Sequence, residues 1–484
     1  MIDLTDSTLL RERCFVAGAW IDADDGGRSP VTDPATGATI AHVPRCGTGE
    51  TARAIAAAEA AFPAWRAETA GRRAALLRRW FELILENRED LALLMTLEQG
   101  KPLAEARGEI DYAASYVEWF AEEAKRLYGD FIPSPLPDRR IVVVKEPVGV
   151  CAAITPWNFP AAMITRKAAP ALAAGCTMIV KPAEQTPLSA LALAALAERA
   201  GIPPGVFSVV TGPARQIGAV LTASPAVRKL TFTGSTEVGR LLIGQCAGTV
   251  KRLSMELGGN APFIVFDDAD LDAAVAGALA SKYRNSGQTC VCSNRFLVQG
   301  GIYDRFAARL SEAVAAMTVG NGLEDGVQQG PLIDAAALAK VEELVADATR
   351  SGAAVAVGGR RHTLGGTWFE PTVLTGVTAS MRVAVEEIFG PVAPLIRFTD
   401  EAEAVRLAND SDYGLAAYLF TRDHARVWRV GEALEYGMVG INTGLISTAV
   451  APFGGVKQSG FGREGSRYGI EDYVEIKYLC MGGL

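Results

Sequence analysis

The sequence is poor in histidine, in clustered positive charge and in long apolar runs. With three histidines in all, a Cys–His catalytic pair or a histidine-rich metal centre has few residues to draw on, and no metal is expected. A formal net charge of −8 argues against a nucleic-acid-binding surface, which needs a basic stripe. The most apolar stretch, residues 148–180, is interrupted by polar and charged residues and falls short of the roughly 20 apolar residues that span a membrane.

The N-terminal segment MIDLTDSTLLRERCF lacks the features of a secretory leader, because acidic residues begin at Asp3 and no uninterrupted apolar run follows. Eight cysteines scattered over 484 residues also do not resemble a secreted disulfide framework. We therefore expect a cytoplasmic protein with neither a nucleic-acid nor a membrane partner.

Short apolar strands alternate with helical segments from residue 175 onward, which predicts βαβ units and mostly parallel sheets. The clearest strands are expected at 177–181, 206–212, 228–234 and 262–266. Two β-branched segments, 139–150 and 471–480, do not fit the alternation. We expect both to be edge strands that need a partner.

The loop NSGQTCVCSN places Cys290 and Cys292 one residue apart. A zinc site needs about four ligands, and no histidine lies near these cysteines in the sequence. A disulfide between them would close a small, strained ring that is easily reduced, which suits a redox switch better than a structural bond. A catalytic thiol is the remaining interpretation, because the loop offers backbone N–H groups and small neighbours.

Three further segments carry polar groups suited to chemistry. In MELGGN, Glu256 is a candidate general base, although a surface glutamate before a turn is the alternative. In ITPWNFP, the Asn158 amide could donate to an oxyanion or could instead cap a helix. In FTGSTEVG, Gly234 and Ser235 precede a helix and could cradle a phosphate.

Seven segments occur in the order ITPWNFP, KPAEQTP, FTGST, MELGGN, GQTC, EEIFGP and PFGGVKQSG, and together they resemble the aldehyde dehydrogenase superfamily. GQTCVCSN, WNFPAAMITRK, GLIS and YGIEDYVEIKYLC are similar to the segments of succinate-semialdehyde dehydrogenases. The resemblance implies an α/β fold with a Rossmann-like cofactor domain, an α/β catalytic domain and a β oligomerisation arm in a homodimer or homotetramer. The implied ranges are 1–127 and 146–257 for the cofactor domain, 258–458 for the catalytic domain, and 128–145 and 459–484 for the arm.

The resemblance also implies a reaction. Cys290 attacks the aldehyde as a thiolate, and the Asn158 amide and the Cys290 backbone N–H hold the oxyanion. Hydride leaves to a nicotinamide, and Glu256 activates the water that hydrolyses the resulting thioester. Cys292 is a spectator in turnover or one half of an oxidative switch. A scaffold without activity and a cofactor-free hydrolase are the alternatives from other classes.

Cofactor contacts carried over from the family are Trp157, Gly234 and Ser235 near the pyrophosphate, Lys181 and Glu184 near the adenosine ribose, and Glu387 and Phe389 around the nicotinamide ribose. Gly258 is a further expected cofactor contact, because a glycine lets the backbone approach a ligand closely. Because the Glu184 carboxylate would repel a 2′-phosphate, we expect NAD to be preferred, with NADP as the alternative.

Substrate contacts carried over are Arg166, Arg284 and Ser447, which would bind a distal carboxylate. Arg284 is expected on the last turn of the helix before Cys290. The predicted substrate is succinic semialdehyde, an intermediate of GABA degradation. Glutarate semialdehyde is the close alternative, because one methylene changes binding by only about 1–3 kcal/mol; a broader aliphatic aldehyde is the other.

Overall fold

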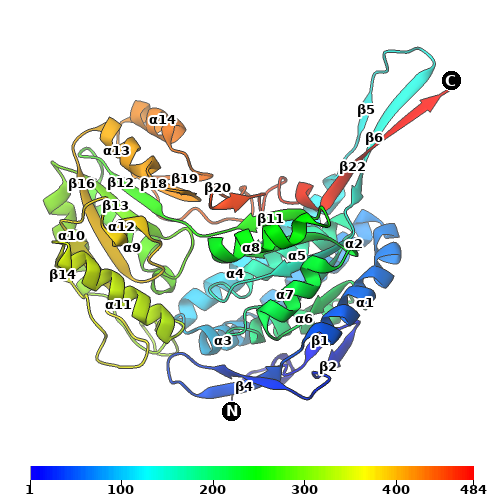
Figure 1. Cartoon of the computed structure of the whole chain (residues 1–484), viewed down its shortest axis with the longest axis horizontal. Helices are drawn as coiled ribbons and strands as arrows, with labels where there is room; N and C mark the ends of the chain where they lie inside the picture. The colour runs from blue at the N-terminus through cyan, green and yellow to red at the C-terminus, as the bar shows by residue number, and fades with distance from the viewer. Residues whose placement is uncertain (1) are drawn as a thin grey trace.

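The computed structural model describes residues 2–484 and contains two large sheets that form neighbouring lobes (Figure 1). The first sheet has eight strands, and its central strands are parallel. In spatial order they are β2 (Ala19–Ile21), β1 (Cys14–Val16), β9 (Phe207–Val209), β8 (Thr177–Lys181), β7 (Val150–Ile154), β10 (Val227–Thr233), β11 (Arg252–Glu256) and β21 (Gly460–Phe461). Apolar residues dominate the central strands because a parallel sheet is covered on both faces.

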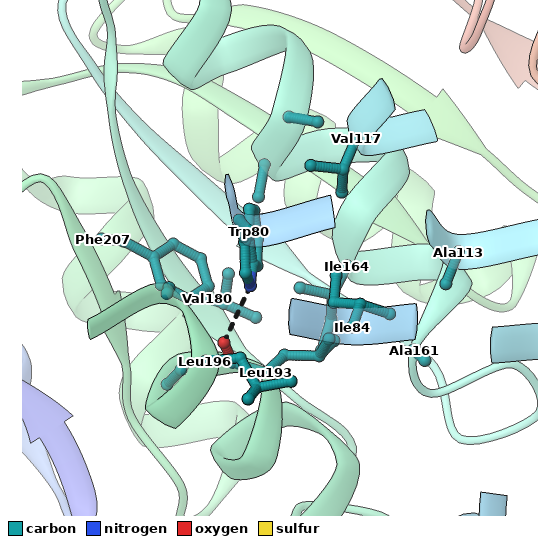
Figure 2. Packing of buried hydrophobic residues seen from close by; sticks show 14 of the residues in the cluster. Trp80, Ile84, Ala113, Val117, Ala161, Ile164, Val180, Leu193, Leu196 and Phe207 are labelled. Carbon is teal, nitrogen blue, oxygen red and sulfur yellow. Dashed lines mark hydrogen bonds between the residues drawn. The ribbon is translucent and has the colours of Figure 1, made fainter. Parts of the chain in front are cut away.

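The helices of this lobe are α1 (Thr48–Ala67), α2 (Ala70–Glu86), α3 (Arg88–Gln99), α4 (Leu103–Glu123), α5 (Ala162–Ala174), α6 (Leu188–Arg199), α7 (Ala214–Ala223) and α8 (Thr236–Ala247). Figure 2 shows the core at which α2 meets α6. The fully buried Trp80 indole donates a hydrogen bond to the Leu193 carbonyl at 3.1 Å and packs at 5.5 Å from the Phe207 ring. The polar atom of the indole is thus satisfied inside an apolar core.

The second sheet has seven strands, of which only the edge strand β14 runs antiparallel to its neighbour. In spatial order they are β14 (Ala354–Val357), β15 (Thr372–Thr375), β16 (Val392–Phe398), β13 (Ser293–Gln299), β12 (Ala261–Val265), β18 (Ala416–Phe420) and β19 (Met438–Ile441). Its helices are α9 (Leu271–Lys282), α10 (Tyr303–Ala315), α11 (Ala335–Arg350), α12 (Arg382–Val385), α13 (Glu401–Asn409) and α14 (His424–Ala433).

A three-stranded arm projects from the first lobe and ends beside the C-terminus (Figure 1). It contains β5 (Asp130–Ile132), β6 (Arg139–Pro147) and β22 (Val474–Gly482). The two segments predicted to be edge strands therefore pair with each other, antiparallel from Val474 opposite Pro147 to Gly482 opposite Arg139. Exposed apolar side chains lie along the arm, among them Phe131 and Ile476.

Two short antiparallel pairs complete the sheets: β3 (Arg28–Thr32) with β4 (Thr39–Pro44), and β17 (Tyr413–Gly414) with β20 (Val456–Lys457). No helix within residues 2–484 is long and apolar enough to cross a bilayer. The strands expected at 177–181, 206–212, 228–234 and 262–266 are present as β8, β9, β10 and β12, each within a few residues of its predicted bounds. The predicted α/β class is confirmed, while the domain boundaries stay predictions.

Candidate active site

A cavity of about 270 Å³ opens where the loops after β7, β10 and β11 meet the loop that carries Cys290. Ligand sites of parallel sheets form in this position, beyond the carboxyl ends of the strands. The predicted residues that line it are Trp157, Asn158, Gly234, Ser235, Gly258, Cys290, Glu387 and Phe389. Met163, Ala337 and Lys340 also line the cavity, and sequence reasoning missed them.

The turn before the nucleophile loop is left-handed. Asn285 and Ser286 have φ of 52° and 55°, and Gly287 follows at 74°. A Cβ on Gly287 would lie 2.2 Å from the Gly390 carbonyl oxygen, so no larger residue fits there. This turn corrects one prediction: α9 ends at Lys282, and Arg284 lies in the irregular segment beyond the helix.

Cys290 is half-buried at the cavity wall. Burial raises the pKa of its thiol to about 12, although the charges of Arg166 and Arg284 act in the opposite direction. The cavity walls alone therefore disfavour the thiolate that the family resemblance implies. Gly259 lies against this loop, where a Cβ would come within 2.3 Å of the Cys290 carbonyl oxygen.

Cys292 is buried, and its thiol donates to the Lys282 carbonyl at 3.1 Å. Burial also raises the pKa of this thiol. Both cysteines are free in the structure, so the Cys290–Cys292 switch stays a prediction.

Asn158 is buried in the loop between β7 and α5. Its Nδ2 donates one hydrogen bond, to the Gln288 carbonyl at 3.0 Å, and its Oδ1 has no partner among residues 2–484. The helix-cap alternative is wrong, because α5 begins at Ala162 and its N-cap position is Ala161. The amide is thus fixed in direction beside the nucleophile loop, with a second N–H left for a ligand.

Glu256 ends β11 and is 3% exposed, so the surface-glutamate alternative is wrong. Neither carboxylate oxygen has a hydrogen-bond partner within the described chain. Burial, with the nearby charge of Glu464, raises its pKa well above the usual range, while Arg166 and Lys167 lower it. A buried carboxyl with an elevated pKa suits proton transfer near neutral pH.

Glu256 and three further buried ionisable residues form a group that we call the base cluster. The other three members are Arg166, Lys167 and Glu464. Glu464 lies 2.6 Å from an Arg166 nitrogen and 2.5 Å from the Lys167 ammonium, which also donates to Thr233 at 2.6 Å. Burial acts to lower the pKa of Arg166, but Glu464, Tyr116, Tyr112 and Glu256 together outweigh it and raise that pKa. The charge of Arg166 is therefore already engaged by Glu464.

Arg284, predicted for the same role as Arg166, has a different environment. It is half-exposed, its guanidinium centre lies 5.3 Å from the Phe159 ring centroid, and no carboxylate of the described chain forms an ion pair with it. Ser447 is half-buried in the loop after β19. Neither residue lines the cavity that contains Cys290.

The cavity walls fit a nucleotide phosphate between β10 and α8. Ser235 is the N-cap of α8 and accepts from the Val238 N–H at 3.4 Å, so a helix N-terminus faces this wall. A Cβ on Gly258 would lie 2.9 Å from a Glu387 carboxylate oxygen, which keeps the backbone open at the opposite wall. Burial raises the pKa of Glu387 to about 6, against the hydrogen bond that it accepts from the Gly259 N–H.

Trp157 and Phe389, which both line the cavity, meet edge to face with ring centroids 5.6 Å apart. Phe389 has φ of 54°, a conformation that costs free energy for a bulky residue and is typical of functional sites. The Lys340 ammonium donates to the Glu387 carbonyl at 2.6 Å, and it ties α11 to this wall.

Lys181 and Glu184 lie at the end of β8, outside the cavity lining. Burial lowers the pKa of Lys181 to about 8, and its ammonium lies 3.9 Å from the Glu184 carboxylate. Glu184 is exposed and accepts from the Ala214 N–H at the start of α7 at 3.0 Å.

The aldehyde dehydrogenase family profile matches residues 20–479. A glutarate-semialdehyde dehydrogenase from Pseudomonas aeruginosa is 66% identical over 483 residues, covering 100% of both chains. The NADP(+) succinate-semialdehyde dehydrogenase of Escherichia coli K12 is 64% identical over 99% of each chain. A crystal structure of succinate-semialdehyde dehydrogenase from Burkholderia pseudomallei has a TM-score of 0.99 at 65% identity and covers 99% of this chain and 100% of that one.

These matches span the fold and the cavity together, and they confirm the aldehyde-dehydrogenase-like architecture that the seven segments predicted. The cofactor of the family is a nicotinamide dinucleotide, NAD or NADP, which agrees with the N-terminus of α8 at the cavity wall. With this profile, these relatives and this site, the chain belongs to the aldehyde dehydrogenase family.

Proposed function

We propose that this aldehyde dehydrogenase oxidises a short semialdehyde with a distal carboxylate, succinic semialdehyde in the first place, and prefers NAD. The observation that carries the proposal is that Cys290 and Asn158 line one cavity while Glu256, buried directly before the lining residue Leu257 in the chain, is close enough to raise the pKa of the Cys290 thiol. Arg284, which has no ion-pair partner among residues 2–484, lowers the pKa of the same thiol. Relatives named for succinate semialdehyde and for glutarate semialdehyde support both chain lengths, so glutarate semialdehyde is the second candidate.

The chain's own residues carry the acyl chemistry. Cys290 gives its proton to solvent and its sulfur attacks the aldehyde carbon, while the Asn158 Nδ2–H and the Cys290 backbone N–H donate to the oxyanion. A bound nicotinamide dinucleotide supplies the hydride acceptor for the oxidation. Glu256 then accepts a proton from the water that releases the acid from Cys290, and Arg166 and Lys167 favour its ionised form.

Trp157, Gly234 and Ser235 would hold the pyrophosphate, and Glu387 and Phe389 the nicotinamide side, with Gly258 leaving room between them. The NAD preference rests on Glu184, whose exposed carboxylate offsets the single cation Lys181 beside it. A 2′-phosphate would meet that carboxylate, whereas ribose hydroxyls could donate to it.

For the substrate, Arg284 is the better candidate for the distal carboxylate, because Arg166 already forms an ion pair with Glu464. Ser447 would add a hydroxyl contact. The exposed apolar side chains of the arm support a homodimer or homotetramer built through β5, β6 and β22.

The test is a panel of succinic semialdehyde, glutaric semialdehyde and butanal, each with NAD and with NADP, followed by the absorbance of the reduced nicotinamide. We expect the highest kcat/KM for succinic semialdehyde with NAD. A preference for butanal would exclude the carboxylate proposal, and a clear preference for NADP would exclude the role given to Glu184.

A further inference from the structure

We propose that Lys101, Glu105 and Glu109 act as positioning residues that fix the Asn158 amide relative to Cys290. Together with Asn285 they form a group that we call the α4 brace. The inference rests on the proposed function, since it assumes that Asn158 donates to the oxyanion. None of the four residues lines the cavity, so the group acts through Asn158 and not on the substrate.

The first half of the brace is a buried ion pair. The side chains of Lys101 and Glu109 are each 1% exposed, with Nζ and Oε2 2.5 Å apart. The Lys101 ammonium also donates to the backbone carbonyl of Asn158 at 2.8 Å. The other Glu109 oxygen accepts from the Ala161 and Ala162 N–H groups, at 3.0 and 3.2 Å, where α5 begins. The pair therefore holds the segment after β7 at two points, the Asn158 carbonyl and the start of α5.

The second half begins one helical turn earlier on the same face of α4. Glu105 accepts from the Asn285 backbone N–H at 2.8 Å, which holds the left-handed turn before Cys290. The Asn285 side chain donates to the Asn158 carbonyl at 2.9 Å and to the Gln288 carbonyl at 3.2 Å. Because Asn158 also donates to the Gln288 carbonyl, the oxyanion loop and the nucleophile loop are joined by a closed set of hydrogen bonds.

The brace is also linked to Arg284, the proposed substrate contact, through the ring of Phe159. The Lys101 ammonium lies 4.1 Å from the Phe159 ring centroid, and the Arg284 guanidinium centre lies 5.3 Å from the same centroid. Two cations thus contact the aromatic ring that follows Asn158 in the chain.

Burial of an ion pair is costly, and apolar residues of similar volume often stabilise a protein as well or better. The Lys101–Glu109 pair therefore calls for a reason beyond stability. An ammonium on the Asn158 carbonyl and a carboxylate on the α5 N–H groups give that reason, because each hydrogen bond removes a direction in which the amide could move.

The test compares Lys101→Met, Glu109→Gln and the charge-neutral double variant Lys101→Met/Glu109→Gln in the full-length protein. We expect kcat for succinic semialdehyde to fall about 10–100-fold in each, with KM changed less than about threefold. The double variant should lose no more than the worse single variant, since both residues act on one amide. If a single variant fails to fold, the double variant, which removes both members of the buried ion pair, still gives the result.

Two further measurements separate positioning from general damage. Alkylation of Cys290 by iodoacetamide needs no oxyanion donor, so its rate should stay within about twofold of the wild-type rate. In an Asn158→Ala background, Lys101→Met should cause no further loss of kcat. Lys251→Met is the matched control, because that buried ammonium also donates to backbone carbonyls, of Ser224 and Val227, away from the cavity.

Unchanged kcat in the double variant, an equal slowing of alkylation, or additive losses with Asn158→Ala would each overturn the inference. Failure of the proposed function is a separate result, visible in the wild type as no oxidation of semialdehydes or in Cys290→Ala as undiminished turnover.

Discussion

The base cluster and the α4 brace are both buried groups of acids and bases beside one cavity, but they differ in how their acids are satisfied. In the brace, both Glu109 oxygens accept hydrogen bonds and Glu105 accepts from Asn285. In the base cluster, Glu256 accepts none, while Glu464 beside it engages two cations. A fully bonded carboxylate fixes geometry, whereas an unbonded one is free to exchange a proton.

Removal of the free acid should have the largest effect. We expect Glu256→Gln to lower kcat by about 10³-fold, because general-base catalysis contributes about 10²–10⁴. A rapid-mixing experiment should still show one burst of reduced nicotinamide per site, since the step before hydrolysis does not use Glu256. If Glu256→Gln turned over at the wild-type rate, Glu256 would not be the general base, and the functional contrast between the base cluster and the α4 brace would be wrong.

The next prediction concerns the ionisation of Cys290. Two members of the base cluster act on the pKa of this thiol in opposite directions: Arg166 lowers it and Glu256 raises it. With that pKa raised to about 12 by burial, the thiolate fraction grows with pH throughout the neutral range. The rate of iodoacetamide alkylation without cofactor should therefore rise about tenfold per pH unit between roughly pH 7 and 9. A plateau near neutral pH would mean that the thiol is already ionised.

Arg166 is paired with Glu464, whereas Arg284 has no ion-pair partner among residues 2–484, so Arg284 is the arginine whose charge is available to a substrate. Arg284→Ala should lower kcat/KM for succinic semialdehyde by about 10–100-fold, the value of a charge-assisted contact of about 1.5–3 kcal/mol. Butanal should be oxidised at an unchanged rate. Equal losses for both aldehydes would remove Arg284 from substrate recognition.

The smallest expected effect is on stability. Because the pKa of Glu256 is raised by folding, the folded state retains a proton that the unfolded state releases above about pH 4.5, and this group lowers the free energy of unfolding as pH rises. The pKa of Glu464 is lowered by folding, so its contribution to the free energy of unfolding changes below about pH 4.5. Chemical denaturation of wild type and Glu256→Gln should show the variant gaining relative stability from about pH 5 to pH 8. A constant difference would mean that Glu256 is ionised in the folded protein.

Much of this molecule follows from short-range sequence patterns. β8 and β12 are apolar runs of strand length, and Ser235 and Glu256 follow or end strands in recognisable segments. Sequence patterns do not predict which partners the buried charged residues have, because the partners are distant in sequence. Glu464 lies almost 300 residues from Arg166, and Lys101 lies 57 from Asn158. Ordinary glutamates and lysines on helices carry no local signal of burial.

The position of Arg284 shows another limit. The helix α9 ends at Lys282, and the backbone reversal at Asn285–Gly287, directly after Arg284, leaves the arginine in an irregular turn. Asn and Gly tolerate this conformation, but Ser286 adopts it because the surrounding contacts require it.

Glu464 belongs to the stretch of chain that runs outward into β22, the last strand of the arm. The counter-ion for two interior cations is therefore supplied by a segment that follows every cavity-lining residue in the chain. These ion pairs therefore anchor the interior of the first lobe to the segment that leads into the arm.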